Sequence, residues 1–473
     1  MGAVLSTCVR IRRIVRLPLE KPSFYTFLSL IKKGAVCFME TKITTKQGAL
    51  QGVLSQDGKT CIFRGVPYAQ PPVGELRFRR PQAHEPWEGV WDCTAFGPRC
   101  PQADLASMDF YGKEFYDAMV PREDEDCLYL NIWTPAQAQP EDKLPVLFWI
   151  HGGAFMHGCG SEKEFDGEAF ARQGVILVTI NYRVNAFGFF AHPELEKENP
   201  EGVSGNYGIL DQIFALQWVR ENIAAFGGDP EKITIDGQSA GCMSVQTLSS
   251  SPLTKGLFQG AILQSGGGIR ALGTTPSKET LWEISQKLLE HLGCSTVEQL
   301  RQAPANTLRD AAYAVQGEEL RWRPHVDGWL LPATTDELAE SGAIHPISYM
   351  IGSTGDDIGD GKLLQESGAR WCENLQKLGR RPAYFYFFDR KLPGDSAGAF
   401  HSCELWYQFG TLDRCWRPWE DCDRELSQVM NSYWANFAKT GDPNGEGLPE
   451  WKAYTQENTQ PLVLGETVGQ PKN

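Results

Sequence analysis

The sequence predicts a protein of the α/β class, with a large, mostly parallel sheet covered by helices. After residue 128, short apolar runs alternate with segments of helical spacing. Such strands are buried on both faces, which requires helices on both sides of the sheet. The 473 residues, 41% of them hydrophobic, suffice for a large core. No repeat or low-complexity linker divides residues 40–473, so we expect one domain over residues 39–473.

The expected elements can be placed in chain order. Residues 43–66 contain short strand-like runs broken by glycines, which predicts an antiparallel meander at the start of the domain. Helices are expected at 211–226 and 240–248, where apolar residues recur with helical spacing. Buried strands are expected at residues 128–133, 146–150, 175–180, 232–235, 261–264, 348–351 and 383–388.

Charge and cysteine content exclude several functional classes. The net charge of −14 disfavours nucleic acid as a partner, because an acidic surface repels phosphates. The thirteen cysteines include no C-x-x-C pair, which argues against a zinc site or a thioredoxin-like motif. We expect reduced thiols in a cytoplasmic protein, with secretion as the alternative. No apolar run reaches 18 residues, so no membrane anchor is expected.

The first 38 residues form a basic segment that fits no targeting signal well. Its longest apolar stretch is interrupted by Thr26 and Ser29, and no clean cleavage site follows. Met39 opens a sequence typical of a domain start. We interpret residues 1–38 as a translated leader ahead of the true start at Met39, and N-terminal sequencing that finds residues 1–38 intact in the native protein would contradict this.

The sharpest motif is the G-x-S-x-G sequence at residues 237–241. It lies between a predicted strand and a predicted helix, which is the setting in which a strained turn raises a serine hydroxyl out of a sheet. The following helix would direct its N-terminal N–H groups at developing negative charge. The pattern therefore predicts Ser239 as a nucleophile.

A serine hydroxyl needs a base and an acid that orients this base. Of the eight histidines, only His401 leaves a long stretch after Ser239 that contains an acid at a strand end. Asp357 and its neighbour Asp356 follow the predicted strand at 348–351, at the sheet edge where such an acid belongs. Asp389 and Asp395, which follow the next predicted strand, remain alternatives. Aspartates at strand exits also often serve only as turn formers.

A small-residue loop at 151–155, His-Gly-Gly-Ala-Phe, follows the predicted strand at 146–150. Such a loop lets backbone N–H groups approach a tetrahedral intermediate, and the N–H of Ala240 would complete the oxyanion hole. His151 itself is interpreted as bracing this loop rather than as the base.

With these residues placed, residues 43–460 resemble the type-B carboxylesterase family, the carboxylesterase and cholinesterase group, and most closely its bacterial members. The matching blocks occur in the family's order. They are residues 63–69 (FRGVPYA), 77–81 (RFRRP), 125–133 (EDCLYLNIW), 181–183 (NYR), 205–208 (GNYG), 211–212 (DQ), 226–230 (FGGDP), 237–241, 400–401 (FH) and 434–444 (WANFAKTGDPN).

The resemblance implies the α/β-hydrolase fold and hydrolysis of small-molecule carboxylic esters. It assigns the nucleophile to Ser239, the base to His401 and the acid to Asp357, with Asp356 as the alternative. The family acid is usually Glu, so the shorter Asp makes this assignment the weakest of the three. The implied oxyanion donors are Gly153, Ala154 and Ala240. Neither a metal nor an organic cofactor is implied, and the oligomeric state is left open.

Three features depart from the family pattern or bear on it. About two dozen residues separate Asp357 from the strand predicted at 383–388, where many members carry a long helical insertion, so we expect a reduced cap. The segment between Cys100 and Cys127 contains no Trp, which argues against choline specificity, although Phe110 and Tyr111 offer rings for a cation–π contact. The resemblance also pairs Cys100 with Cys127 as a disulfide, which we expect to be reduced in a cytoplasmic protein.

A binding module that has lost catalysis is the competing function from another class. Such members typically lack the serine and carry a membrane anchor, whereas Ser239, His401 and the small-residue loop are present in this sequence. Among hydrolases, a thioesterase, an amidase or a triacylglycerol lipase remains open. A lipase would be expected to have a marked apolar lid, against which the short segment after Asp357 argues.

Overall fold

The computed structural model describes residues 41–105, 109–117, 121–272, 275–317, 320–359 and 361–470. The predicted leader at residues 1–38 lies outside these described residues. The strands of the main sheet are β3 (Val53–Leu54), β4 (Thr60–Pro67), β6 (Tyr129–Pro135), β7 (Leu144–Ile150), β8 (Ile176–Ile180), β9 (Gly228–Gln238), β10 (Gly260–Gln264), β11 (Ser348–Thr354), β12 (Tyr384–Phe388), β13 (Leu462–Leu464) and β14 (Val468–Gly469).

Within the described residues these eleven strands pair in the order β14-β13-β12-β11-β10-β9-β7-β8-β6-β4-β3. All pairings from β8 to β13 are parallel, which confirms the predicted mostly parallel sheet. Antiparallel strands lie at both edges, because β6, β4 and β3 pair antiparallel at one edge and β14 does so at the other. The parallel region therefore begins one strand later than the alternation after residue 128 suggests.

The N-terminal meander is divided between two sheets. Strands β1 (Lys42–Thr44) and β2 (Ala49–Gln51) form an antiparallel hairpin. This hairpin pairs with β5 (Val90–Asp92) in a separate three-stranded sheet. Only β3 and β4 of the meander join the main sheet.

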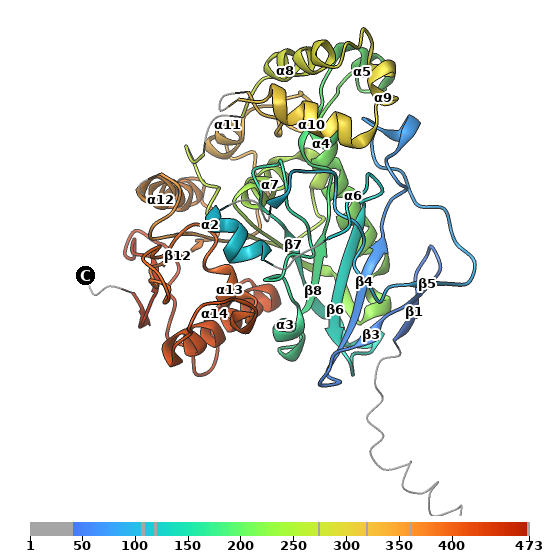
Figure 1. Cartoon of the computed structure of the whole chain (residues 1–473). Helices are drawn as coiled ribbons and strands as arrows, with labels where there is room; N and C mark the ends of the chain where they lie inside the picture. Colours follow the sequence, from blue (N-terminus) through green and yellow to red (C-terminus); the bar gives the residue numbers. More distant parts are fainter. Residues whose placement is uncertain are drawn as a thin grey trace, which may run out of the picture. The chain divides into compact units, whose positions relative to one another are not determined.

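Helices cover the main sheet (Figure 1). Strand β12 follows β11 after a single helix of sixteen residues, α12, which agrees with a reduced cap. No helix in the described part of the chain is both long and apolar enough to cross a membrane. The helices are α2 (Asp109–Tyr111), α3 (Glu168–Arg172), α4 (Asn185–Phe189), α5 (Pro193–Glu198), α6 (Tyr207–Asn222), α7 (Ala240–Ser250), α8 (Lys278–His291), α9 (Val297–Arg301), α10 (Ala305–Val315), α11 (Thr335–Glu340), α12 (Lys362–Lys377), α13 (Leu405–Gln408) and α14 (Asp421–Thr440).

Alternate residues of β7 show why both faces of the sheet must be covered. Leu147 and Trp149 pack in the apolar cluster that contains α13 and α14. Phe148 and Ile150 pack in the other cluster, which contains α6 and α7. All four side chains are fully buried. The continuous apolar runs of the sequence thus supply two cores, and the sheet between them holds the carboxyl ends of its parallel strands at one edge.

Candidate active site

Ser239 occupies the sharp turn between β9 and α7. Its backbone has φ 57° and ψ −122°, a conformation that non-glycine residues rarely adopt. The Ser239 N–H donates to the carbonyl of Gln264 on β10 (2.8 Å), and the N–H of Met243 donates to the Ser239 carbonyl (3.0 Å). This strained turn between a strand and a helix is the arrangement that the motif predicts.

The two glycines of the motif allow the backbones of β7, β9 and α7 to approach one another closely. A Cβ atom added at Gly241 would lie 2.0 Å from the carbonyl oxygen of Ile150 on β7. One added at Gly237 would lie 2.5 Å from the backbone of Gly241. No larger side chain fits at either position without displacing backbone, so β7 and α7 can pack this tightly only with glycine there.

His401 is hydrogen-bonded to Asp357, one of the two acids at the end of β11. His401 Nδ1 lies 2.5 Å from Asp357 Oδ1, and the Asp357 side chain is fully buried. Asp357 also accepts from the N–H groups of Thr354 (2.9 Å) and Ile358 (2.8 Å). Burial alone would raise the pKa of Asp357, but the hydrogen bond and the charge of His401, with the hydrogen bond from the Thr354 amide, lower it below the ordinary value.

The three alternative acids have other partners. Asp356 is half exposed and binds Lys391 (2.6 Å) and the N–H of Ala399 (2.8 Å). Asp389 also pairs with Lys391, at 3.3 Å. Asp395 pairs with Arg417 at 2.9 Å. The structure therefore places Asp357 on His401 and the other three away from it.

The predicted oxyanion loop, residues 151–155, lies against the turn that carries Ser239. A Cβ atom added at Gly152 would lie 3.2 Å from Ser239 Cβ. Gly153 (φ 97°) and Ala154 (φ 56°) both have positive φ and line the same cleft as Ser239. Ala240 follows the serine directly as the first residue of α7 and is buried. The three predicted donors are thus gathered around Ser239, and Ala154 tolerates the strained backbone that a glycine would adopt freely.

His151 braces this loop. Its ring stacks on Tyr182 with centroids 4.3 Å apart, and the Tyr182 hydroxyl donates to the His151 carbonyl (3.0 Å). Burial lowers the pKa of His151 to about 3. A neutral, stacked imidazole of this kind is suited to support and not to serve as the base.

Ser239, His401 and the oxyanion loop line one cleft of about 300 Å³. This is at the lower end of the range typical of small-ligand sites. Aromatic residues form much of its wall, and Phe110 packs edge-on against Phe400, the residue before His401 (4.8 Å between centroids). The aromatic and aliphatic lining residues are Tyr111, Phe115, Tyr116, Phe165, Ile358 and Leu405.

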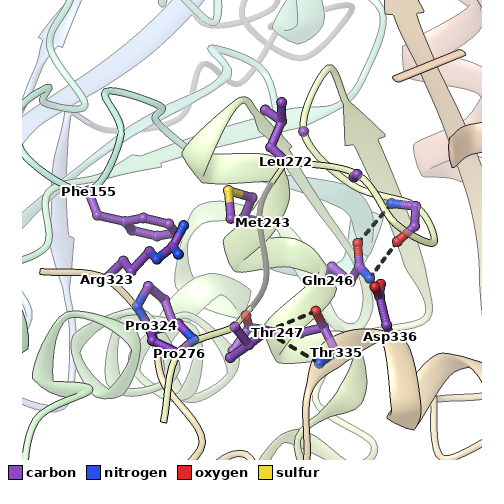
Figure 2. Close-up of a pocket in the computed structure, with 14 residues that line it drawn as sticks. Phe155, Met243, Gln246, Thr247, Leu272, Pro276, Arg323, Pro324, Thr335 and Asp336 are labelled. Atoms are coloured by element: carbon purple, nitrogen blue, oxygen red, sulfur yellow. Dashed lines mark hydrogen bonds between the residues drawn. The ribbon is translucent and has the colours of Figure 1, made fainter. Parts of the chain in front are cut away.

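A second, smaller pocket of about 40 Å³ lies beside the same elements (Figure 2). Phe155 of the oxyanion loop and Met243 of α7 contribute to it. Gln246, one turn further along α7, holds the backbone of Gly268 by two hydrogen bonds of 2.9 and 2.8 Å. A small pocket therefore lies next to the helix that follows Ser239.

Sequence reasoning missed four polar residues around the site. The Gln238 amide nitrogen lies 3.3 Å from His401 Nε2. Ser265 donates to Glu404 (3.4 Å), and burial raises the pKa of Glu404 to about 8. Asp236 accepts hydrogen bonds from Gln264 and Gln408, and burial raises its pKa to about 8. Of these four residues, only Gln238 could have been found from the sequence, because it directly precedes the serine of the motif. The other three lie on separate segments of the chain and come together only in the folded structure.

The sequence model of the carboxylesterase family matches residues 39–363 and 361–472 of this chain. The chain belongs to the carboxylesterase family. Among curated relatives, this carboxylesterase is 36% identical to the para-nitrobenzyl esterase of Bacillus subtilis, over 89% of this chain and 94% of the relative. It is 32% identical to the pyrethroid hydrolase Ces2a of Mus musculus, over 89% of this chain and 88% of the relative.

Solved structures agree with this assignment. A PNB esterase is 33% identical, with a TM-score of 0.78 that covers 92% of this chain and 97% of that one. The Geobacillus stearothermophilus carboxylesterase EST55 is 34% identical, with the same TM-score over 91% and 98% of the two chains. The predicted α/β-hydrolase fold is confirmed, and the protein is a carboxylic ester hydrolase. In this carboxylesterase Cys100 and Cys127 are both buried free thiols.

Proposed function

We propose that this carboxylesterase hydrolyses short- to medium-chain acyl esters through an acyl-enzyme on Ser239. His401 acts as general base and Asp357 orients it. The observation that carries the proposal is the His401–Asp357 hydrogen bond of 2.5 Å in the cleft that also contains Ser239 on its strained turn. A nucleophile, a base and an orienting acid in this order are the parts that acyl transfer requires.

The proposed reaction has two halves. Ser239 Oγ attacks the ester carbonyl carbon while His401 Nε2 takes the hydroxyl proton, and the N–H groups of Gly153, Ala154 and Ala240 stabilise the oxyanion. His401 then returns the proton to the departing alcohol, which leaves the acyl group on Ser239. In the second half His401 activates water, and the acid is released. Asp357 keeps Nδ1 protonated so that Nε2 stays free to accept.

The cleft volume supports the proposed acyl length. About 300 Å³ lined largely by aromatic and aliphatic side chains suits a small apolar ester. The printed names of two relatives, a para-nitrobenzyl esterase and a pyrethroid hydrolase, support an ester substrate without specifying one. We further propose the cytoplasm as the site of action, with secretion as the alternative.

Turnover of p-nitrophenyl acetate, butyrate and decanoate tests this proposal. We expect acetate and butyrate to be preferred, and Ser239→Ala and His401→Ala each to lower kcat by roughly a thousandfold or more. A decanoate optimum would move the assignment toward a lipase. Folded wild-type protein that turns over none of the three esters would contradict the proposal.

A further inference from the structure

Two buried glutamates line the catalytic cleft without a role in acyl transfer. Glu162 and Glu164 lie in the segment between β7 and α3 and are only 6% and 2% exposed. Both line the cleft that contains Ser239 and His401. Buried carboxyl groups are costly unless they are paired, so the partners of this acid pair need to be accounted for.

Glu162 has its hydrogen bonds satisfied, whereas Glu164 does not. Glu162 Oε1 accepts from the N–H of Cys159 (2.8 Å), and its Oε2 accepts from the Tyr116 hydroxyl (3.3 Å). The charge of Glu162 further raises the pKa of Glu164. Glu164 Oε2 is buried and has no hydrogen-bond partner within the described part of the chain. This oxygen is an acceptor that lacks a donor.

The surroundings favour a cation as that donor. No Lys or Arg is among the described residues that line the cleft. Burial raises the pKa of both carboxyl groups, and the charges of Arg99 and Lys163 offset this only in part. The aromatic rings of Phe115, Tyr116 and Phe165 line the same cleft and offer faces that attract a cation.

We propose that Glu162 and Glu164 form a subsite for a protonated primary or secondary amine carried by the ester substrate. The inference rests on the proposed ester hydrolysis at Ser239 and names a substrate class for it. An ammonium N–H would donate to Glu164 Oε2 and bring a positive charge to the two buried carboxyl groups. A quaternary ammonium has no N–H to donate, so the subsite differs from one for choline esters.

Two matched pairs of esters test the subsite from both sides of the scissile bond. 4-(Aminomethyl)phenyl acetate is compared with 4-ethylphenyl acetate, and 4-nitrophenyl 4-(aminomethyl)benzoate with 4-nitrophenyl 4-ethylbenzoate. Each pair differs by an ammonium in place of a methyl group. In at least one pair we expect kcat/KM to favour the amine, and Glu164→Gln to reduce that preference by roughly tenfold or more, the scale of one charge-assisted hydrogen bond.

The control is Glu168→Gln on α3, whose side chain is partly exposed and pairs with Arg172. It should leave the amine-to-ethyl ratio unchanged. Because each preference is a ratio within one protein, partial loss of folding does not imitate the effect. Wild-type turnover of the ethyl esters without amine preference, or a Glu164→Gln ratio equal to that of wild type, would overturn the subsite while leaving ester hydrolysis intact.

Inhibition provides a readout that is independent of amine turnover. Benzylammonium should inhibit hydrolysis of 4-ethylphenyl acetate more tightly than benzyl alcohol does, and Glu164→Gln should remove that difference. Equal inhibition by the two compounds in the wild type would overturn the inference. Absence of turnover with every ester would contradict the proposed function itself.

Discussion

At the scale of single residues, the directions in which two adjacent aspartate side chains point decide which of them is hydrogen-bonded to His401. Asp356 and Asp357 follow the same strand, and composition gives no reason to prefer either. In the fold, Asp356 turns outward to Lys391, and Asp357 is buried against His401. One peptide unit therefore separates a surface ion pair from the carboxylate that is hydrogen-bonded to His401.

Exchange of each aspartate for asparagine tests this division. Asp357→Asn should lower kcat/KM for p-nitrophenyl butyrate by roughly a thousandfold, because an amide no longer stabilises the protonated imidazole or selects its tautomer. Asp356→Asn removes only a half-exposed ion pair and should change kcat/KM by no more than about threefold. Similar losses in the two variants would show that the assignment of the acid is wrong.

At the scale of elements, the site depends on the contact between β7 and the start of α7. The sequence predicts both elements, and the G-x-S-x-G motif marks the turn. The contact itself is a backbone approach in which Gly241 faces the carbonyl oxygen of Ile150. It holds the oxyanion loop, which follows β7, next to Ser239.

Gly241→Ala should separate these two elements. The added methyl would lie 2.0 Å from a backbone oxygen, so β7 or α7 must shift. We expect a loss of about 1–3 kcal/mol in the free energy of unfolding and a fall in kcat that exceeds the loss of folded protein. Thermal unfolding and p-nitrophenyl butyrate turnover measure the two effects.

Gly469→Ala is the matched control, because a Cβ atom at Gly469 meets no atom within 4 Å. It should leave both quantities near wild type. An active, fully stable Gly241→Ala protein would mean that the close approach is not required.

At the scale of the whole molecule, buried acids beneath the site link its stability to pH. The pKa values of Glu404 and Asp236 are both raised to about 8, in each case mainly by burial, from 4.5 and 3.8. Both groups therefore take up protons on folding. Their contribution to stability is complete below about pH 4 and is lost as pH rises through about 8.

Urea unfolding at pH 5, 7 and 8.5 measures this linkage. The free energy of unfolding of Glu404→Gln should decline less with rising pH than that of the wild type, because one of the two titrating groups is gone. Glu425→Gln changes an exposed acid and should retain the wild-type slope. A Glu404→Gln slope equal to the wild-type slope would contradict the assignment of Glu404 as a buried, protonated acid.

Much of this organisation could be predicted before the structure. The parallel strands, α7 and the serine turn follow from local patterns, because apolar runs and glycine spacing act over a few residues. The edges of the sheet could not be predicted in the same way. The pairing of β2 with β5, and the antiparallel pairing of β6 with its neighbours, depend on which distant strand offers free backbone groups.

The sequence by itself determined the family, the class of fold and the positions of Ser239 and His401, since these depend on short motifs and their order in the chain. Only the tertiary structure decided that Asp357 and not Asp356 meets His401. It alone brought Glu162 and Glu164 into the cleft. Side-chain direction and burial are set by packing between distant segments, so spacing along the chain predicts neither of them.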